Sequence, residues 1–417
     1  MDCKLGPTDG GEALQLGGID GHHSCTQSVS VMSYSVDMFG RMFTGQQRHV
    51  AYMEALRQSI KPGDVVIDIG TGIGVYAMQA ARLGARKVYA IEPNPLVRLG
   101  PSLAQANGFS DDHIEFYETF STEFDPPELA DVIFADLRGR TPLYAANVPA
   151  LYDAATRLLK PGGILIPQVD SIYASLVCSS EARMSMWSQW NDNPFGFDLA
   201  AALELQFASI QSVAVCPADL LTARELVAQI NYGTDPTVDV QHTWRSVVAA
   251  DGVASGLASW FDGVLIPGVT VSNGPEVEPS VYGGAFLGFA KPFDVRAGET
   301  VELSLRAVYR ADEYTWSWSA GVVDGNGVAS NLLRGSTLMN TPMTKRSLAL
   351  LSDDRTLTPS RRIEADALML SLLVNGATVG NVSDRLFTDY PDVFSRRLEA
   401  KDAVVSTANS YARLGRV

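Results

Sequence analysis

The spacing of hydrophobic residues divides this chain into three regions with different periodicities. Up to about residue 167, short apolar runs alternate with segments that have helical periodicity. Apolar runs of this kind are typical of parallel strands buried on both faces. We therefore predict a doubly wound α/β domain over residues 31–167. The predicted strands are 65–69, 87–91, 114–117, 131–135 and 163–166, and the predicted helices are 46–60, 75–83, 95–107 and 145–159.

Residues 168–335 change to strict alternation of polar and apolar positions. Runs such as 301–307 (VELSLRA) and 314–318 (YTWSW) place every second side chain on one face. This period is typical of half-buried antiparallel strands. We predict an antiparallel β-barrel domain here, followed by a joint rich in Gly, Asn and Ser at 324–340.

The region 336–417 is predicted to be a small helical C-terminal module. Its first helix has an apolar face formed by Ile363, Ala367, Leu370 and Val374 and ends near Gly376. A second, short helix and a third helix follow, and the three are expected to share one miniature core. Their apolar positions are Val379, Val382 and Leu386 on the second, and Phe394, Leu398, Val405 and Ala408 on the third.

Composition narrows the class of protein and its partners. The 417 residues carry a formal net charge of −15, which opposes binding to nucleic acid. No apolar run is long enough to cross a membrane, and residues 1–30 lack a signal-peptide pattern, so we expect a cytoplasmic protein with a mobile N-terminus. The scattered cysteines, Cys3, Cys25, Cys178 and Cys216, predict neither a metal site nor a disulfide framework.

The strongest local motif is the stretch 64–95, which combines strand, glycine turn, helix and strand. Gly70, Gly72 and Gly74 allow a sharp turn against a ligand, and Glu92 ends the second strand, where a carboxylate can accept hydrogen bonds from ribose hydroxyls. Asp68 at the end of the first strand would repel a pyrophosphate but suits a cationic amino-acid tail. These features favour S-adenosylmethionine over NAD as the cofactor.

Several longer strings make residues 33–320 resemble the protein arginine methyltransferases. MFTGQQRHVAY (42–52) resembles the cofactor-lid helix of that family, and LLKPGGILIPQ (158–168) its strand ending in a proline between two domains. NPFGFDLA (193–200) resembles its barrel entrance. The resemblance implies a Rossmann-like methyltransferase domain followed by a barrel.

The resemblance also implies roles for individual residues in the cofactor site. Arg48 would bind the cofactor carboxylate, Asp68 and Gly70 would line the methionine portion, and Glu92 would hold the ribose. Met42 would pack near the sulfonium, and the stretch Phe120, Ser121 and Thr122 would meet the adenine. The full set of predicted cofactor residues is Met42, Arg48, Asp68, Gly70, Gly72, Gly74, Glu92, Pro93, Ser121 and Thr122.

The chain departs from the family at the residues that hold the arginine substrate. Two glutamates on a hairpin hold a guanidinium in the family, because paired carboxylates match its planar set of donors. Here FADLRGRTPLYAAN (134–147) puts Asp136 at the first acid and Ala145 at the second. Ser280-Val281-Tyr282 replaces the Thr-His-Trp loop, while His242 falls in an earlier strand and is interpreted as structural. Methylation of protein arginine is therefore doubtful.

The remaining residues predict a different acceptor. Asp136 ends a strand at the carboxyl edge of the sheet, where it is predicted to act as the base, with the Tyr144 hydroxyl orienting the acceptor. Arg138 and Arg140 would place positive charge beside the pocket, which favours an anionic or neutral substrate; the alternative is a solvated pair in a loop. The predicted substrate-binding residues are Tyr34, Arg138 and Tyr282.

The C-terminal module offers one indication of the substrate class. Its string 370–382 resembles small winged-helix modules that recognise leader peptides in ribosomally made natural-product pathways. A helical cap or a dimer contact is an equal alternative. Our first hypothesis is a methyltransferase that modifies a peptide or natural-product intermediate at a non-guanidinium atom. The alternatives are a protein arginine methyltransferase with a reduced acidic pair and a non-catalytic binding protein.

The resemblance finally implies a homodimer formed through a barrel-borne arm. The segment 187–207 (WSQWNDNPFGFDLAAALELQF) offers aromatic and aliphatic surface for it.

Overall fold

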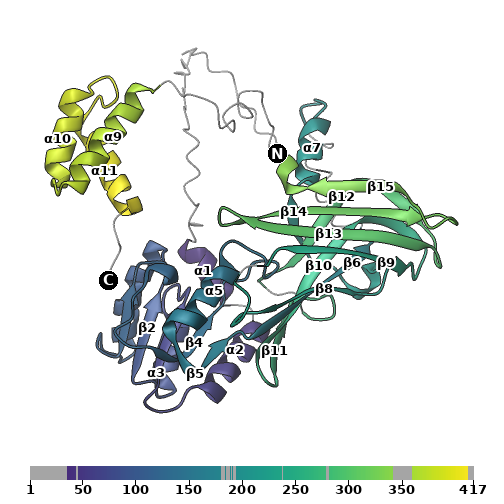
Figure 1. Cartoon of the computed structure of the whole chain (residues 1–417), viewed down its shortest axis with the longest axis horizontal. Helices are drawn as coiled ribbons and strands as arrows, with labels where there is room; N and C mark the ends of the chain where they lie inside the picture. Colours follow the sequence, from purple (N-terminus) through teal and green to yellow (C-terminus); the bar gives the residue numbers. More distant parts are fainter. Residues whose placement is uncertain are drawn as a thin grey trace, which may run out of the picture.

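The computed structural model describes residues 35–43, 46–179, 194–236, 238–278, 281–340 and 359–411, together with 184, 188 and 190. The predicted mobile segment 1–30 and Tyr34 lie outside these residues. In the first domain a parallel sheet has the order β3-β2-β1-β4-β5, which is the doubly wound arrangement (Figure 1). Its strands are β1 (Val65–Ile69), β2 (Lys87–Ile91), β3 (Ile114–Tyr117), β4 (Ala130–Ala135) and β5 (Leu159–Ile166).

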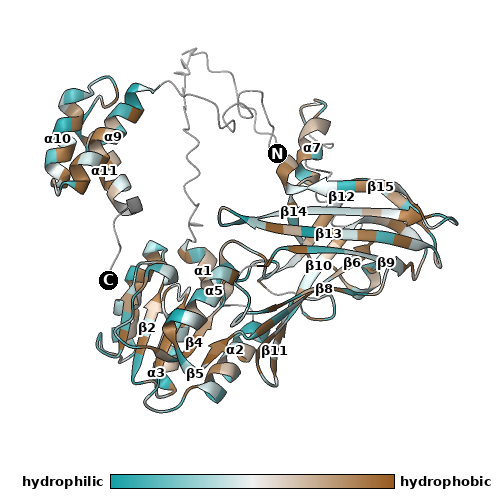
Figure 2. Cartoon of the chain, viewed as in Figure 1, coloured by the Kyte–Doolittle hydropathy of each residue, from teal (hydrophilic) through white to brown (hydrophobic). Residues whose placement is uncertain are grey.

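The burial of this sheet explains its sequence. All five residues of β1 are buried, and Figure 2 shows mostly hydrophobic residues along β4. A strand covered on both faces has no solvent side, so its residues do not alternate between polar and apolar. The bounds of the five strands agree with the predicted ranges to within a few residues.

The helices of the first domain follow the predicted positions with two differences. The predicted helix 95–107 consists of a 3-10 turn, η1 (Pro95–Leu99), and a separate α4 (Gly100–Ala106), with Pro101 in the first turn of α4. Proline fits there because it lacks the N–H that an interior position needs. The second difference is that helix 145–159 is shorter and ends in a π-turn. The other helices are α1 (Val36–Met42), α2 (Gln46–Ser59), α3 (Val75–Arg82) and α5 (Asn147–Asp153), with the π-turn at Ala154–Leu158.

The second domain consists of two antiparallel sheets. One has the order β7-β12-β10-β6-β8, with β11 paired to β10, and the other has the order β15-β14-β13-β9. The first contains β6 (Val169–Val177), β7 (Ile210–Val213), β8 (Glu225–Asn231), β10 (Gly252–Ile266), β11 (Val269–Ser272) and β12 (Gly284–Val295). The second contains β9 (Val240–Val247), β13 (Thr300–Arg310), β14 (Glu313–Val323) and β15 (Ala329–Ser336). Helix α7 (Ala200–Phe207) packs against β12.

The predicted joint at 324–340 is wrong in its central part, because residues 329–336 form strand β15. Its polar composition suggested a linker. Pairing with β14 nevertheless satisfies the backbone groups on one side of this strand, and a strand at the edge of a sheet does not need apolar residues on both faces.

One hydrophobic core joins the two domains. It runs from Ile67 and Ile133 of the parallel sheet, through Leu151 of α5, to Leu176 of β6 and Trp316 of β14. A shared core fixes the carboxyl edge of the parallel sheet against the antiparallel sheets. Residues from both domains therefore meet at that edge.

The C-terminal module contains α9 (Arg361–Val374), α10 (Val379–Asp389) and α11 (Arg397–Tyr411), which share their own core. The predicted core face of the first helix is wrong: Ile363, Ala367, Leu370 and Val374 are exposed, whereas Ala365 and Met369 are buried. Leu398 and Val405 are also exposed, and Val404 is buried instead. Several apolar stripes fit the helical period, and only packing on α10 selects one of them. Any strands of a winged helix at 341–358 lie outside the described residues.

None of the helices that the structure describes is both long and apolar enough to span a bilayer.

Candidate active site

The glycine turn after β1 holds the carboxylate of Glu92 in a fixed orientation. Gly70 and Gly72 have φ values of 75° and 58°, which side chains rarely tolerate. The Gly72 N–H donates to Glu92 Oε2 at 3.1 Å, and the Asn94 N–H donates to Oε1 at 2.8 Å. Each carboxylate oxygen keeps a further lone pair for a ligand hydroxyl. Pro93, which lies between Glu92 and Asn94 in the chain, is half-buried.

Gly74 has a packing role in this turn. A Cβ at this position would lie 2.5 Å from Cε1 of Phe116, a buried residue of β3. Gly74 therefore allows the start of α3 to approach the sheet closely. This contact explains the third glycine without a ligand, and its predicted role in cofactor binding stays a prediction.

Asp68 is a buried acid with no ion pair among the described residues. Its side chain accepts a hydrogen bond from the Thr71 hydroxyl at 2.5 Å. Burial raises the pKa of Asp68 from 3.8 to about 7, and the nearby Glu92 carboxylate raises it as well, while the Thr71 hydroxyl opposes the shift. Burying an unpaired carboxylate is unfavourable unless a cation joins it. The position suits the positive charge of an amino-acid tail.

We predict that Asp68 makes the stability of the ligand-free protein depend on pH. Between 3.8 and about 7 the folded protein binds a proton that the unfolded chain releases, so stability falls as pH rises through this window. Scanning fluorimetry from pH 5.5 to 8 should show this fall in the wild type and a flatter profile in Asp68→Asn. S-adenosylhomocysteine, whose amino-acid tail carries an ammonium group, should raise the melting temperature more at pH 8 than at pH 6. Identical profiles for the two proteins would contradict the assignment.

Arg48 lies on α2 and is buried, whereas most arginines on helices lie at the surface. Its NH1 atom pairs with Asp136 Oδ2 at 2.5 Å, and its NH2 atom donates to the Met42 carbonyl at 3.3 Å. Its Nε is buried without a hydrogen-bond partner in the described structure. A buried donor of this kind is costly unless a ligand satisfies it, so the site accommodates an incoming carboxylate.

Arg157 binds the backbone of the segment 121–124, part of which is predicted to meet the adenine. Ser121 is buried and begins the 3-10 turn η2 (Ser121–Glu123), whereas Thr122 is exposed. Arg157 donates to the carbonyls of Ser121 at 2.6 Å and Phe124 at 2.5 Å. The backbone of the turn is thereby fixed.

Asp136 lies just beyond β4 and already has three partners. Besides Arg48, the Tyr282 hydroxyl donates to Oδ2 at 2.6 Å and Arg138 Nε donates to Oδ1 at 3.3 Å. Burial alone would raise the pKa of Asp136, but the charges of Arg138 and Arg48 and the Tyr282 hydroxyl outweigh it and lower the pKa. Asp136 is therefore ionised at neutral pH, and only part of its hydrogen-bonding capacity is free.

The expectation that Arg138 faces the substrate is not supported by its position. Its side chain is 1% exposed and pairs with Asp170 Oδ1 at 3.1 Å, as well as with Asp136. It also donates to the Tyr52 hydroxyl and lies 4.9 Å from the ring centre of Phe261. Arg138 thus neutralises buried acids at the domain junction, while Arg140 is exposed.

Tyr282 and Tyr144 of the predicted site, and His242, which was interpreted as structural, lie in three different surroundings. Tyr282 is buried and reaches Asp136 from the barrel side, as described above. The Tyr144 ring packs on Gly139, where a Cβ would lie 2.8 Å from its Cγ. Ala145 follows with a φ of 42°. His242 lies in β9, where it contacts Glu225 at 2.9 Å.

Several members of the buried network were missed in the sequence. Asp170 of β6 accepts from Arg138 and from the Tyr232 hydroxyl, at 2.6 Å, and the Tyr52 hydroxyl donates to the Ala135 carbonyl. The only signal for Asp170 was an acid in a strand that is otherwise largely apolar. His49 and Tyr76, which lie beside Arg48, carried no signal at all.

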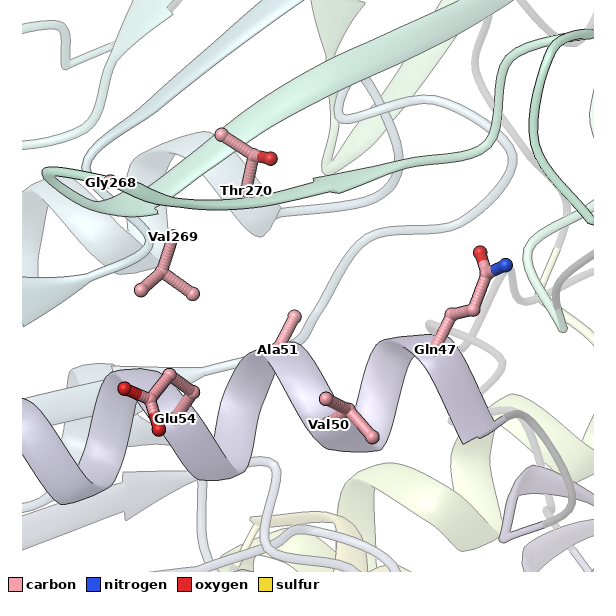
Figure 3. Close-up of a pocket in the computed structure, with 7 residues that line it drawn as sticks. All are labelled: Gln47, Val50, Ala51, Glu54, Gly268, Val269 and Thr270. Carbon is pink, nitrogen blue, oxygen red and sulfur yellow. The ribbon is translucent and has the colours of Figure 1, made fainter.

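The hollow in Figure 3 lies between α2 and the β10–β11 hairpin, and its lining contains none of the predicted site residues. It is lined by Gln47, Val50, Ala51, Glu54, Gly268, Val269 and Thr270.

Comparisons with known proteins show what this chain is similar to. Residues 47–168 match the family model "Ribosomal protein L11 methyltransferase (PrmA)". The chain is 28% identical over 269 residues to the arginine N(omega)-methyltransferase of Streptomyces achromogenes subsp. streptozoticus, covering 63% of this chain and 74% of that protein. It is 28% identical to the probable protein arginine N-methyltransferase 6 of Arabidopsis thaliana, with 54% of each covered. The chain thus spans about half the length of this second relative.

Solved structures show the same fold. Arabidopsis thaliana protein arginine methyltransferase 10 superposes with a TM-score of 0.62 at 19% identity, covering 73% of this chain and 98% of that one. The Trypanosoma brucei PRMT1 enzyme-prozyme complex with AdoHcy gives a TM-score of 0.63 at 20% identity, covering 72% and 97%.

The fold, the glycine turn and the family match together define a methyltransferase that uses S-adenosylmethionine. In sequence and architecture this enzyme resembles the protein arginine methyltransferases. The ligand-side features fit the cofactor: an unpaired buried acid at Asp68, an unsatisfied Arg48 Nε and a fixed Glu92 carboxylate.

Proposed function

We propose that this enzyme methylates a nitrogen, oxygen or carbon atom of a peptide or natural-product intermediate, and that the acceptor is not a guanidinium. The observation that carries the proposal is the lack of a pair of free carboxylates in the segment 134–147, which corresponds to the family's two-glutamate hairpin. Its single carboxylate, Asp136, already contacts Arg48, Arg138 and Tyr282, and Ala145 stands in place of the second acid. A guanidinium would find no paired carboxylates here.

The charge balance of the site supports the same conclusion. The buried network contains two cations, Arg48 and Arg138, and two acids, Asp136 and Asp170. Each acid is therefore already compensated. A cationic acceptor would bring an unpaired charge into a buried site, which is unfavourable. A neutral amine, hydroxyl or activated carbon would not.

Within this proposal Asp136 orients the acceptor and takes its proton, and Tyr282 fixes the carboxylate from the barrel side. The lowered pKa of Asp136 makes it a weak base at neutral pH, so it suits an acceptor that loses its proton readily as the methyl group is transferred. Arg48, Asp68 and Glu92 would bind the cofactor, with Gly70 and Gly72 allowing its close approach. The Tyr144 hydroxyl would help to orient the acceptor.

The acceptor class is tested by methyl transfer from labelled S-adenosylmethionine to matched acceptors. We expect free arginine and arginine-rich peptides to remain at the level of the reaction without enzyme. Peptides of the same length that lack arginine but present a free amine or hydroxyl form the second arm. Acid hydrolysis of any labelled product identifies the modified residue. Methylarginine in that hydrolysate would refute the proposal.

Arginine methylation is the second candidate, because the relatives carry names of arginine methyltransferases. One is named an arginine N(omega)-methyltransferase, and the other a probable protein arginine N-methyltransferase. A reduced acidic pair would then hold the guanidinium through Asp136 alone. The non-catalytic alternative has no support from the comparisons, whose named relatives are methyltransferases.

The domain roles and partners complete the proposal. Residues 31–167 would bind the cofactor, 168–335 would bind substrate and a second copy of the chain, and 336–417 would recognise a peptide. The exposed Phe195 and Phe197, which precede α7, are consistent with an arm of a homodimer. A cytoplasmic location also stays a prediction.

A further inference from the structure

Helix α1 packs directly on the glycine turn of the cofactor site. Phe39 is the buried residue of α1, and a Cβ on Gly72 would lie 2.6 Å from Phe39 Cε1. The Gly72 N–H is also the donor that orients Glu92. The position of α1 therefore affects the backbone that shapes the site.

The C-terminal end of α1 is held by His49 of α2. The Met42 carbonyl, at the end of the helix, lies 2.8 Å from His49 Nε2 and accepts a second hydrogen bond from Arg48. The other ring nitrogen, Nδ1, lies 2.5 Å from the Tyr76 hydroxyl of α3. Because a carbonyl can only accept, Nε2 carries the proton. In the neutral ring, Nδ1 then accepts a hydrogen bond from the Tyr76 hydroxyl.

The surroundings of His49 favour this neutral form. Burial lowers the pKa of His49 below its ordinary 6.5, and the charge of Arg48 lowers it further, whereas the Met42 carbonyl and Asp136 oppose the shift. Burial also raises the pKa of Tyr76, which therefore keeps its proton. The groups facing the ring are Met42 of α1, Arg48 of α2, Tyr76 of α3 and Asp136 beyond β4.

We propose that His49 is a positioning residue for the cofactor site, whose neutral imidazole connects Tyr76 to the Met42 carbonyl and so holds α1 across the glycine turn. The same carbonyl accepts from Arg48, so loosening α1 also removes one partner of the guanidinium that would bind the cofactor carboxylate. His49 acts through α1 and Arg48 without contacting the cofactor. The inference concerns cofactor binding and holds whichever acceptor the enzyme uses.

The first test measures S-adenosylhomocysteine affinity by calorimetry. His49→Ala should weaken binding about tenfold, since about 1.4 kcal/mol corresponds to a factor of ten and two hydrogen bonds are lost. Tyr76→Phe keeps the ring and removes one bond, so it should weaken binding about threefold. His49→Gln retains a donor and an acceptor and should fall between wild type and His49→Ala. Gln58→Ala, an exposed change on the same helix, is the matched control and should bind like wild type.

The second test reports on α1 itself. Arg41 is exposed in α1 and gives a trypsin site there. Cleavage after Arg41, followed by mass spectrometry, should be faster in His49→Ala and Tyr76→Phe than in wild type, and ligand should slow it most in wild type.

Lowering the pH below the pKa of His49 should reduce the affinity ratio between wild type and His49→Gln, because a protonated ring cannot accept from Tyr76.

The proposal is overturned if Tyr76→Phe and His49→Gln both bind the ligand and resist trypsin like wild type. This result counts even if His49→Ala does not fold. Loss of affinity with an unchanged rate of cleavage after Arg41 would also overturn it, since His49 would then act by a route other than α1.

Discussion

Replacing Glu92 by alanine is expected to weaken S-adenosylmethionine binding by about 10²–10⁴-fold. The carboxylate is already fixed by the N–H groups of Gly72 and Asn94, so it presents its remaining lone pairs without further ordering. Two charge-assisted hydrogen bonds to ribose hydroxyls contribute about 1.5–3 kcal/mol each. Their loss gives the expected factor, which calorimetry with S-adenosylmethionine or its demethylated product measures.

Two further variants separate this effect from damage to the turn. Glu92→Gln keeps an oxygen acceptor but loses the charge, so its affinity should lie between wild type and Glu92→Ala. Glu123→Ala removes an exposed acid of η2 and should bind like wild type. If Glu92→Ala binds the cofactor normally while retaining its fold, the carboxylate does not hold the ribose. Tight binding of NADH by the wild type would contradict the choice of cofactor.

Asp136→Asn is expected to lower turnover by about 10²–10⁴-fold while leaving cofactor affinity within a few-fold of wild type. The amide preserves the shape of the side chain but cannot take a proton from the acceptor. Arg138 keeps its pairing with Asp170. Arg48 loses its ion pair with Asp136, but the carboxylate of the bound cofactor would compensate its charge. Turnover is measured at saturating cofactor with an acceptor found in the methyl-transfer assay.

The matched control for Asp136→Asn is Asp131→Asn, at the opposite end of β4, where the acid pairs with Lys160. This variant should keep near-normal turnover. Tyr282→Phe removes the hydroxyl that donates to Asp136 and should cause a smaller loss, because the arginine partners remain. Normal turnover in Asp136→Asn would show that the acceptor arrives deprotonated or that another residue is the base.

Local patterns were sufficient for the first domain and its cofactor turn. The strand, the three glycines and Glu92 lie within 30 residues of one another, so their arrangement follows from chain geometry and the preference of glycine for positive φ. The parallel strands were equally clear, because burial on both faces removes polar residues from them. By contrast, the core face of α9 could not be chosen from periodicity, since its exposed and buried stripes are both apolar.

The partners of charged residues were beyond the reach of sequence patterns. Arg138 looked like a substrate-facing residue because its partner, Asp170, lies 32 positions away on another domain. The same applies to Tyr282, which reaches Asp136 from 146 positions further along the chain. The role that we propose for His49 likewise rests on its contacts with α1 and α3.

The sequence by itself determined the cofactor class and the α/β domain followed by antiparallel sheets, because these depend on residue types at fixed short spacings. The resemblance to the arginine methyltransferases further implies that Ala145 replaces the second hairpin acid. The tertiary structure decided which charges are compensated. Packing of the two domains around one core brings Arg48, Asp136, Arg138 and Asp170 together. Their ion pairs, and thus the lowered pKa of Asp136, arise from long-range contacts that no local pattern encodes.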